Sequence, residues 1–168
     1  MDKKLEQKLA GQIGSKLAKA LGETEFVKTK PAFYTRVRSD RIEFIHLNKL
    51  ASGPYFRVHV GIRFLCDPFP AVALEGISSD EERDCRRRMS YTREEDSLDA
   101  CAEAISDYVR DRGVPWLASW SDRDRLLREE DSPAARFREA YRKYTESGSA
   151  GFEQSAALSR RLLGIKGD

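Results

Sequence analysis

Residues 33–64 read FYTRVRSDRIEFIHLNKLASGPYFRVHVGIRF, and the period of two in this stretch decides the fold. Between Tyr55 and Phe64, apolar and polar side chains alternate, which places them on opposite faces of a strand. We therefore predict a strand with an apolar face toward a helical layer and a basic face toward water. The apolar set is Phe56, Val58, Val60, Ile62 and Phe64, and the other set is Tyr55, Arg57, His59, Gly61 and Arg63.

Two aromatic and β-branched runs come before this strand and predict a hairpin. The runs cover residues 33–38 and 41–47, and only Ser39-Asp40 lies between them. The turn signal Ala51-Ser52-Gly53-Pro54 then leads into the third strand. Because a parallel return would need a crossover of about a dozen residues, these short connections predict an antiparallel meander. We expect three to five strands in total, the further ones at 26–28 and, as a charged edge strand, at 87–91.

Amphipathic helices are predicted before and after the sheet region. Apolar residues recur every four positions from Leu5 to Leu21, which predicts a helix over about residues 2–21 that ends at Gly22 in a left-handed cap. Ser97 is a good N-cap for a helix over 97–112, which Gly113-Val114-Pro115 is expected to end. Further helical segments are predicted at 116–120, at 122–130, from Ser132-Pro133 to Ser147-Gly148-Ser149, and at 152–163.

The resulting architecture is α+β, with an N-terminal helix, an antiparallel meander sheet and C-terminal helices packed on one face of that sheet. At 168 residues, the chain has the usual size of one domain. We therefore expect a single domain over residues 1–168, made of a helix at 1–22, a sheet region at 25–92 and a helical region at 97–168.

Composition favours a globular protein of the cytoplasm. Apolar residues make up 40% of the chain and charged residues 35%, and no apolar run approaches the roughly 18 residues of a membrane span. The first residues lack the pattern of a signal peptide. Cys66, Cys85 and Cys101 are odd in number and have no short spacing, so we expect reduced thiols in a cytoplasmic protein without membrane contact.

The net charge of +2 hides an uneven distribution. Residues 1–66 carry 13 Lys and Arg against 6 Asp and Glu, residues 67–100 carry 5 against 10, and residues 101–168 carry 12 against 12. Such asymmetry can mark a polyanion-binding face, and it is also the ordinary result of solvated surface elements. Without a dense Lys or Arg run, the charge pattern alone gives a weak signal for nucleic acid.

The sequence holds no recognisable catalytic or metal-binding motif. His46, His59 and the cysteines are too scattered to form a CxxC or HxxxH pair, so no metal is predicted. Walker, GxGxxG, GxSxG and HExxH motifs are absent, which disfavours a motif-bearing enzyme and gives no reason to expect a cofactor. A Cys–His nucleophile could still form in space, but Cys101 lies on an apolar helix face, where a cysteine is usually a small core residue.

The best candidate for a functional surface is the polar face of the third strand, which we expect the first strand to extend. Aromatic side chains interleaved with arginines bind protein partners, or stack on nucleic-acid bases and grip phosphates. The alternative is that an outward sheet face simply favours Tyr, Thr and Arg. His46 is expected to be structural, because it shares a strand face with Ile42 and Phe44. The candidate surface consists of Tyr34, Arg36, Arg38, Tyr55, Arg57, His59 and Arg63.

The order of these elements resembles a bacterial family described as domain of unknown function 4304. The resemblance covers about residues 5–120, with Glu23-Thr24-Glu25 as a departure from the first turn of the family. Its motifs are structural, so it implies an α+β fold and transfers no catalytic residue. Small bacterial families of this kind are often immunity or accessory proteins, and the resemblance implies that role. The matching segments are Leu21-Gly22, Phe26-Val27-Lys28, Phe33-Tyr34-Thr35-Arg36, Ile42-Glu43-Phe44-Ile45, the run from Tyr55 to Ile62, and Val114-Pro115-Trp116-Leu117.

Three functions follow as hypotheses. The first is a non-enzymatic bacterial protein-binding domain, of immunity or accessory type, that offers the sheet face or the acidic segment 67–100 to a protein partner. The second is a nucleic-acid-binding module that uses the tyrosines and arginines of the same face. The third is a small-molecule enzyme of unrecognised type, which needs a deep pocket containing His46, His59 or Cys101.

Overall fold

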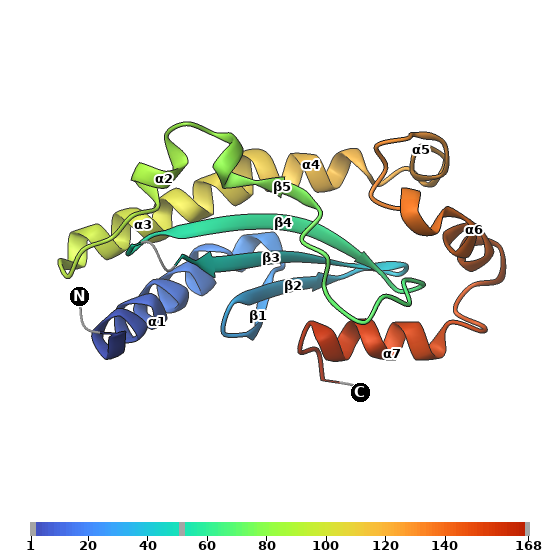
Figure 1. Cartoon of the computed structure of the whole chain (residues 1–168), viewed down its shortest axis with the longest axis horizontal. Coiled ribbons are helices and arrows are strands. Elements are labelled where there is room, and N and C mark those ends of the chain that lie inside the picture. The colour runs from blue at the N-terminus through green and yellow to red at the C-terminus, as the bar shows by residue number, and fades with distance from the viewer. Residues whose placement is uncertain (1–2, 51–52, 167–168) are drawn as a thin grey trace.

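The computed structural model of the chain describes residues 3–50 and 53–166, and a five-stranded antiparallel sheet lies at its centre (Figure 1). Each strand pairs with the next one along the chain, in the order β1-β2-β3-β4-β5. The predicted meander is therefore confirmed, while Ala51 and Ser52 of the predicted turn lie outside the described residues. The strands are β1 (Val27–Lys30), β2 (Phe33–Val37), β3 (Arg41–Lys49), β4 (Phe56–Phe64) and β5 (Gly76–Ser78).

The register between β3 and β4 sorts side chains to the two faces of the sheet. Ile45 lies opposite Val60, and the next pair along, His46 and His59, points to the other side. We call the first side the core face; it also carries Tyr34, Leu47 and Val58. We call the second side the histidine face; it carries Phe33, Phe44, His46, His59 and Arg63.

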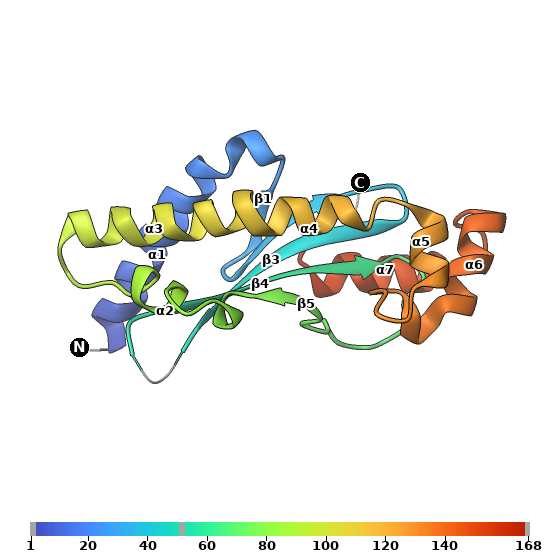
Figure 2. The ribbon, with the colours of Figure 1, turned by 90° about the horizontal axis from the view of Figure 1, so that it is seen from above.

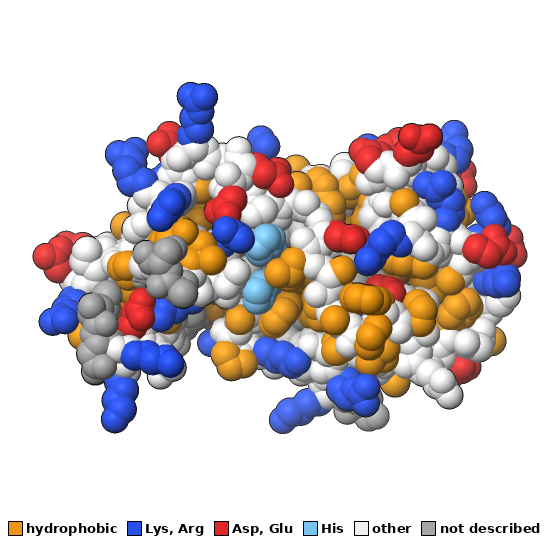
Figure 3. All heavy atoms as spheres, in the orientation of Figure 1, with side chains coloured by type: hydrophobic (Ala, Val, Ile, Leu, Met, Phe, Trp, Pro, Cys, Tyr) orange, Lys and Arg blue, Asp and Glu red, His pale blue; other side chains and the backbone are white. Residues whose placement is uncertain are grey.

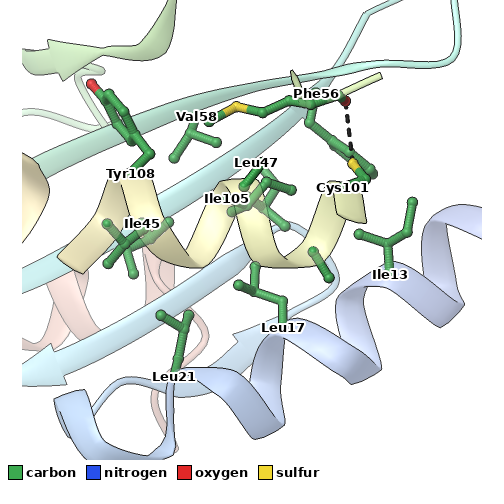
Figure 4. Close-up of a cluster of buried hydrophobic side chains, with 14 of the residues drawn as sticks. Ile13, Leu17, Leu21, Ile45, Leu47, Phe56, Val58, Cys101, Ile105 and Tyr108 are labelled. Carbon is green, nitrogen blue, oxygen red and sulfur yellow. Dashed lines mark hydrogen bonds between the residues drawn. The ribbon is translucent and has the colours of Figure 1, made fainter. Parts of the chain in front are cut away.

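Two helices bury the core face. The stripe of α1 (Lys3–Ala20) that was predicted from its four-residue spacing packs against α3 (Glu95–Tyr108), and both pack on the sheet (Figure 4). Ile13, Leu17 and Ile105 are fully buried where the two helices meet. The chain leaves α1 through a 3₁₀ turn (Gly22–Thr24), and the left-handed residue is Glu25, with φ 63°, instead of the predicted Gly22.

The predicted end of the second long helix at Gly113-Val114-Pro115 is wrong. A π-helical turn (Val109–Gly113) follows α3 and leads directly into α4 (Val114–Ser119), so that the two helices form one long rod (Figure 2). The amide of Val114 donates to the carbonyl of Val109, five residues earlier. Pro115 lacks an amide proton and is tolerated here because it stands in the first turn of α4.

Three further helices gather at one end of the sheet (Figure 1). They are α5 (Arg123–Arg128), α6 (Arg138–Ser147) and α7 (Glu153–Leu162). Helix α6 begins after a 3₁₀ turn (Ala135–Phe137), later than the Ser132-Pro133 signal predicted. Helix α7 lies on the histidine face, where Leu163 packs with Ile42 and Phe44. We expected the C-terminal helices to pack on one face of the sheet; α3 packs on the core face with α1, whereas α7 covers part of the histidine face.

The edge strand predicted at 87–91 is also wrong. Arg87 and Arg88 belong to the short helix α2 (Cys85–Arg88), and only Ser90 forms an isolated bridge, to Tyr55. The fifth strand is instead β5, in the segment that follows the proline-rich stretch, with a 3₁₀ turn (Ser79–Glu81) after it. No helix in residues 3–50 and 53–166 combines the length and the apolar character needed to cross a membrane.

Replacement of Ile105 by Ala should lower the free energy of unfolding by about 2–5 kcal/mol, because it leaves a cavity between α1, α3 and the core face. Urea denaturation followed by circular dichroism measures the change. Glu103→Ala on the exposed side of the same helix is the control and should change the free energy by about 0.5 kcal/mol or less. Equal effects of the two substitutions would contradict the packing described above.

Candidate functional site

The residues of the predicted surface do not share one face. The two-residue turn at Ser39-Asp40 pairs Arg36 with Glu43 and Tyr34 with Ile45, so both Arg36 and Tyr34 point to the core face. Arg57, His59 and Arg63 point to the histidine face. The expectation that the first strand extends the polar face of the third strand is therefore wrong.

The arginines near the turn are already neutralised by carboxylates of the chain. Arg36 Nε lies 2.6 Å from Glu43 Oε2, and this pair is nearly buried. Arg38 Nη2 lies 2.8 Å from Glu25 Oε2, and this contact lowers the pKa of the Glu25 carboxyl. Arg57 on the histidine face forms an ion pair with Asp80. Guanidinium groups held in this way are poorly placed to bind the phosphates of a nucleic acid.

The two tyrosines of the predicted surface are buried. The Tyr34 hydroxyl donates to the carbonyl of Gly14 on α1 at 2.7 Å, and burial raises the pKa of Tyr34 to about 12. Tyr55 is 8% exposed, and the Arg86 guanidinium covers its ring at 4.6 Å. Neither ring offers a free face on which a base could stack, so the nucleic-acid hypothesis loses the residues on which it rested.

Arg63 was expected to face water and is instead only 2% exposed. Each of its three side-chain nitrogens donates at least one hydrogen bond, and the guanidinium also forms an ion pair. Nε donates to Ser159 Oγ of α7 at 2.9 Å, and Nη1 lies 3.0 Å from Asp67 Oδ2. The remaining donors bind the carbonyl oxygens of Ala71, Asp67 and Phe69 at 2.7–2.8 Å. Burial lowers the pKa of the Arg63 guanidinium, and the Asp67 carboxylate beside it opposes this shift.

The three carbonyl groups belong to the connection between β4 and β5, residues 65–75, which we call the Phe69 loop. Asp67 Oδ1 also accepts from the amide of Phe69 at 2.9 Å, which closes a local turn. Gly61 lets the far end of the loop approach the sheet, because a Cβ there would lie 2.7 Å from the carbonyl oxygen of Glu75. The backbone of the Phe69 loop is therefore fixed to the histidine face at several points.

Two large apolar side chains of the Phe69 loop point outward. Phe69 is 46% exposed and Leu74 is 40% exposed, and both are large apolar residues. Arg136 lies over the Phe69 ring, 5.7 Å from its centroid, and forms an ion pair with Glu75 at 3.2 Å. A hollow of about 360 Å³ opens here; it is lined by Asp67, Pro68, Phe69, Pro70, Arg136 and Phe137.

The two histidines of the chain lie side by side on the same face (Figure 3). Their ring centroids are 6.1 Å apart, and the planes of the two rings differ by 24°. The centroid of the Phe33 ring lies 4.5 Å from that of His46. Figure 3 shows the pair at the surface, with apolar side chains gathered on the side toward α5, α6 and α7. His46, which was expected to be structural, thus forms a half-buried surface pair with His59.

Both imidazoles are biased toward the neutral form. Burial lowers the pKa of His46, and the neighbouring His59 lowers it further. Burial also lowers the pKa of His59, together with Arg57, while Asp80 and Glu81 raise it by a smaller amount. A neutral imidazole both donates and accepts a hydrogen bond, so the pair offers uncharged polar contacts in the middle of this face.

The cysteines do not meet the histidines. Cys101 is fully buried on the side of the core face, its thiol donates to the carbonyl of Met89 at 3.2 Å, and burial raises its pKa to about 12 (Figure 4). Burial raises the pKa of Cys66 to about 12 as well. These thiols are poor nucleophiles at neutral pH. Within the described residues, no three side chains of His, Cys, Asp or Glu come together as a metal site.

Sequence reasoning missed Arg63 as an anchor and Phe69 as an exposed residue. The length of the Ser39-Asp40 turn was a signal for the correct register, because a two-residue hairpin fixes which residues are paired. The Asp67-Pro68-Phe69-Pro70 run was a signal for an irregular loop. No local pattern indicated that Ser159, 96 residues further along the chain, would cover Arg63.

Comparison of the chain with protein-family models, with curated proteins and with solved structures finds no match. The resemblance to domain of unknown function 4304 therefore stays a prediction.

Replacement of Arg63 by Met should lower the free energy of unfolding by about 3–5 kcal/mol, because it leaves the buried Asp67 carboxylate and three loop carbonyl groups without their donor. Chemical denaturation measures the loss. The control is Arg57→Met, which breaks an ion pair about one-third exposed and should cost about 1 kcal/mol or less. A loss below about 1 kcal/mol for Arg63→Met would contradict the anchoring role.

The histidine pair should make folding sensitive to acid. Both histidines have a pKa in the folded state below their unfolded value of about 6.5, so each binds fewer protons when the chain is folded. Their contribution to the free energy of unfolding is therefore complete above pH 6.5 and is lost as the pH falls toward the folded pKa. NMR titration of the imidazole C–H signals should give midpoints below 6.5 for both residues. His59→Gln should weaken the fall in stability between pH 7.5 and 5. Midpoints at or above 6.5 would contradict the burial of this pair.

Proposed function

We propose that this chain is a protein-binding domain whose docking surface consists of the Phe69 loop and the adjoining histidine pair. The observation that carries the proposal is that the buried Arg63 guanidinium holds the Phe69 loop by three hydrogen bonds and an ion pair, while Phe69 and Leu74 of that loop face outward. A buried guanidinium is costly unless it is fully paired, so such an anchor is an unusual way to hold a surface loop. Its effect is to keep Phe69 presented to solvent.

A fixed apolar loop is suited to recognition. Binding by a flexible loop loses conformational entropy, whereas a loop already held in place avoids most of that cost. Aromatic and arginine side chains dominate the energy of protein interfaces, and Phe69 and Arg136 lie together at the hollow. The partner we infer is a protein that inserts an apolar side chain into this hollow and makes neutral hydrogen bonds to the histidines.

The other two functions have less support. The arginines and tyrosines proposed for nucleic acid are paired or buried. The enzyme hypothesis needs His46, His59 or Cys101 in a deep pocket, and the Cys101 thiol is enclosed in the core on the far side of the sheet from the histidines. Binding without chemistry agrees with the immunity or accessory role that the family resemblance implies.

Phe69→Ala should weaken partner binding by about 30-fold or more, because it removes the aromatic anchor of the docking surface. Tagged wild-type chain, expressed in the cells that carry its gene, should retain a stoichiometric partner at mild salt. The purified partner is then titrated against each variant, and a photo-crosslinker placed at Leu74 should react with it.

Val27→Ala is the matched control, because Val27 is 61% exposed and lies on β1, at the opposite edge of the sheet from β5. It should bind as the wild type does, and both substitutions should change stability by about 1 kcal/mol or less. The proposal fails if no stoichiometric partner is retained, or if Phe69→Ala and Val27→Ala bind it equally well.

A further inference from the structure

A second hollow, of about 410 Å³, lies at the end of the sheet where the C-terminal helices gather. Its wall combines the turn between β2 and β3, the start of α5, the end of α6 and the face of α7. A volume of this size falls within the range of small-molecule sites. The polar and charged residues of its lining include Ser39, Asp40, Arg123, Tyr144, Ser149 and Arg160.

Arg123 and Arg160 differ from most arginines of the chain. The guanidinium group of neither residue has a hydrogen bond, an ion pair or a ring contact with another described residue, whereas most other guanidinium groups bind a carboxylate or a carbonyl oxygen. The guanidinium groups of Arg83, Arg93 and Arg161 are also unpaired among the described residues, but they do not line this hollow. Two unpaired positive charges, from α5 and α7, therefore line the same hollow.

The acidic residue in the wall does not neutralise them, because its carboxylate already has partners. Asp40 Oδ1 accepts from Arg41 Nε at 2.9 Å, and Oδ2 accepts from Arg41 Nη2 at 3.0 Å and from the Tyr141 hydroxyl at 2.7 Å. Burial by itself would raise the pKa of Asp40, but these donors hold it below its ordinary value. Asp40 and Arg41 thus form a neutral pair, and the net charge of the hollow comes from Arg123 and Arg160.

Both guanidinium groups lie within electrostatic range of the Tyr144 hydroxyl. The Tyr144 hydroxyl donates to the carbonyl of Ser39 at 3.0 Å, on the wall of the hollow. Burial raises the pKa of Tyr144 most, the Asp40 carboxylate raises it further, and Arg160 and Arg123 act in the opposite direction, as positive charges within electrostatic range do. A single compact dianion near this hydroxyl would satisfy both arginines at once.

We propose that the hollow binds a small phosphomonoester, with its phosphate held between Arg123 and Arg160 and its organic group in the remaining space. Guanidinium groups match phosphate oxygens in a bidentate geometry, and the dianionic charge of a phosphomonoester balances the two arginines. The hydroxyl of Ser149 lines the same wall and can donate to a phosphate oxygen. This site is separate from the docking surface proposed above, since the two hollows share no lining residue.

The test is calorimetric titration of the full chain with inorganic phosphate, AMP and succinate at low ionic strength. Wild-type chain should bind AMP and phosphate. The double variant Arg123→Gln/Arg160→Gln should bind them about 100-fold more weakly, because each guanidinium removed should weaken binding by about tenfold. Arg161→Gln is the control, because Arg161 is the exposed, unpaired neighbour of Arg160 on α7. It should bind within about twofold of the wild type, since an exposed charge outside the hollow contributes little.

NMR of the wild-type chain gives a second measurement that does not depend on whether the substituted chains fold. AMP should shift the NMR amide signals of Gly148 and Ser149, which line the hollow, and leave those of the Phe69 loop unchanged. The proposal is overturned by the absence of heat and of amide shifts with both phosphate and AMP, or by wild-type affinity in the double variant. Tighter binding of succinate than of AMP overturns the assignment to phosphate.

Discussion

Side chains of β3 and β4 are sorted by a register that pairs Ile45 with Val60 and His46 with His59, and the other contacts of the fold depend on it. A slip by one residue would exchange the two faces, and would turn the apolar set of β4 away from α1 and α3. The same register brings the histidines together and directs Arg63 to the face that α7 and the Phe69 loop cover. Core packing and surface chemistry therefore have one origin.

Arg63 connects the fold to the proposed function. Its guanidinium joins β4 to Ser159 of α7 and to the backbone of the Phe69 loop, so α7 and the exposed loop are held by one residue. Beside it, the half-buried histidines give an uncharged polar centre at neutral pH. On α7, Arg160 follows Ser159 directly, and it lines a hollow together with Arg123 of α5, where neither guanidinium is paired with a carboxylate of the described residues.

Sequence periodicity predicted the meander, the first helix and the two faces of β4, because these depend on residues close together in the chain. It could not predict which faces are covered. The alternation along β4 correctly placed Arg63 on the other face of the sheet from Val60. The burial of Arg63, however, depends on Ser159, which is remote in sequence. The helix over Gly113-Val114-Pro115 continues because a π-helical turn accommodates Pro115, and no local preference indicates that turn. Arg36 was predicted to share a face with Arg57 and Arg63 but points to the core face, because alternation within a strand does not fix the register between strands.

The central claim is that the buried Arg63 holds the Phe69 loop in one outward-facing conformation before any partner binds. Backbone ¹⁵N relaxation of the free chain tests it most directly, at the amides of Asp67, Phe69 and Ala71. The account predicts order parameters of about 0.85 for these residues, equal to those of β3 and β4. Values below about 0.6 would describe a flexible loop and would contradict it.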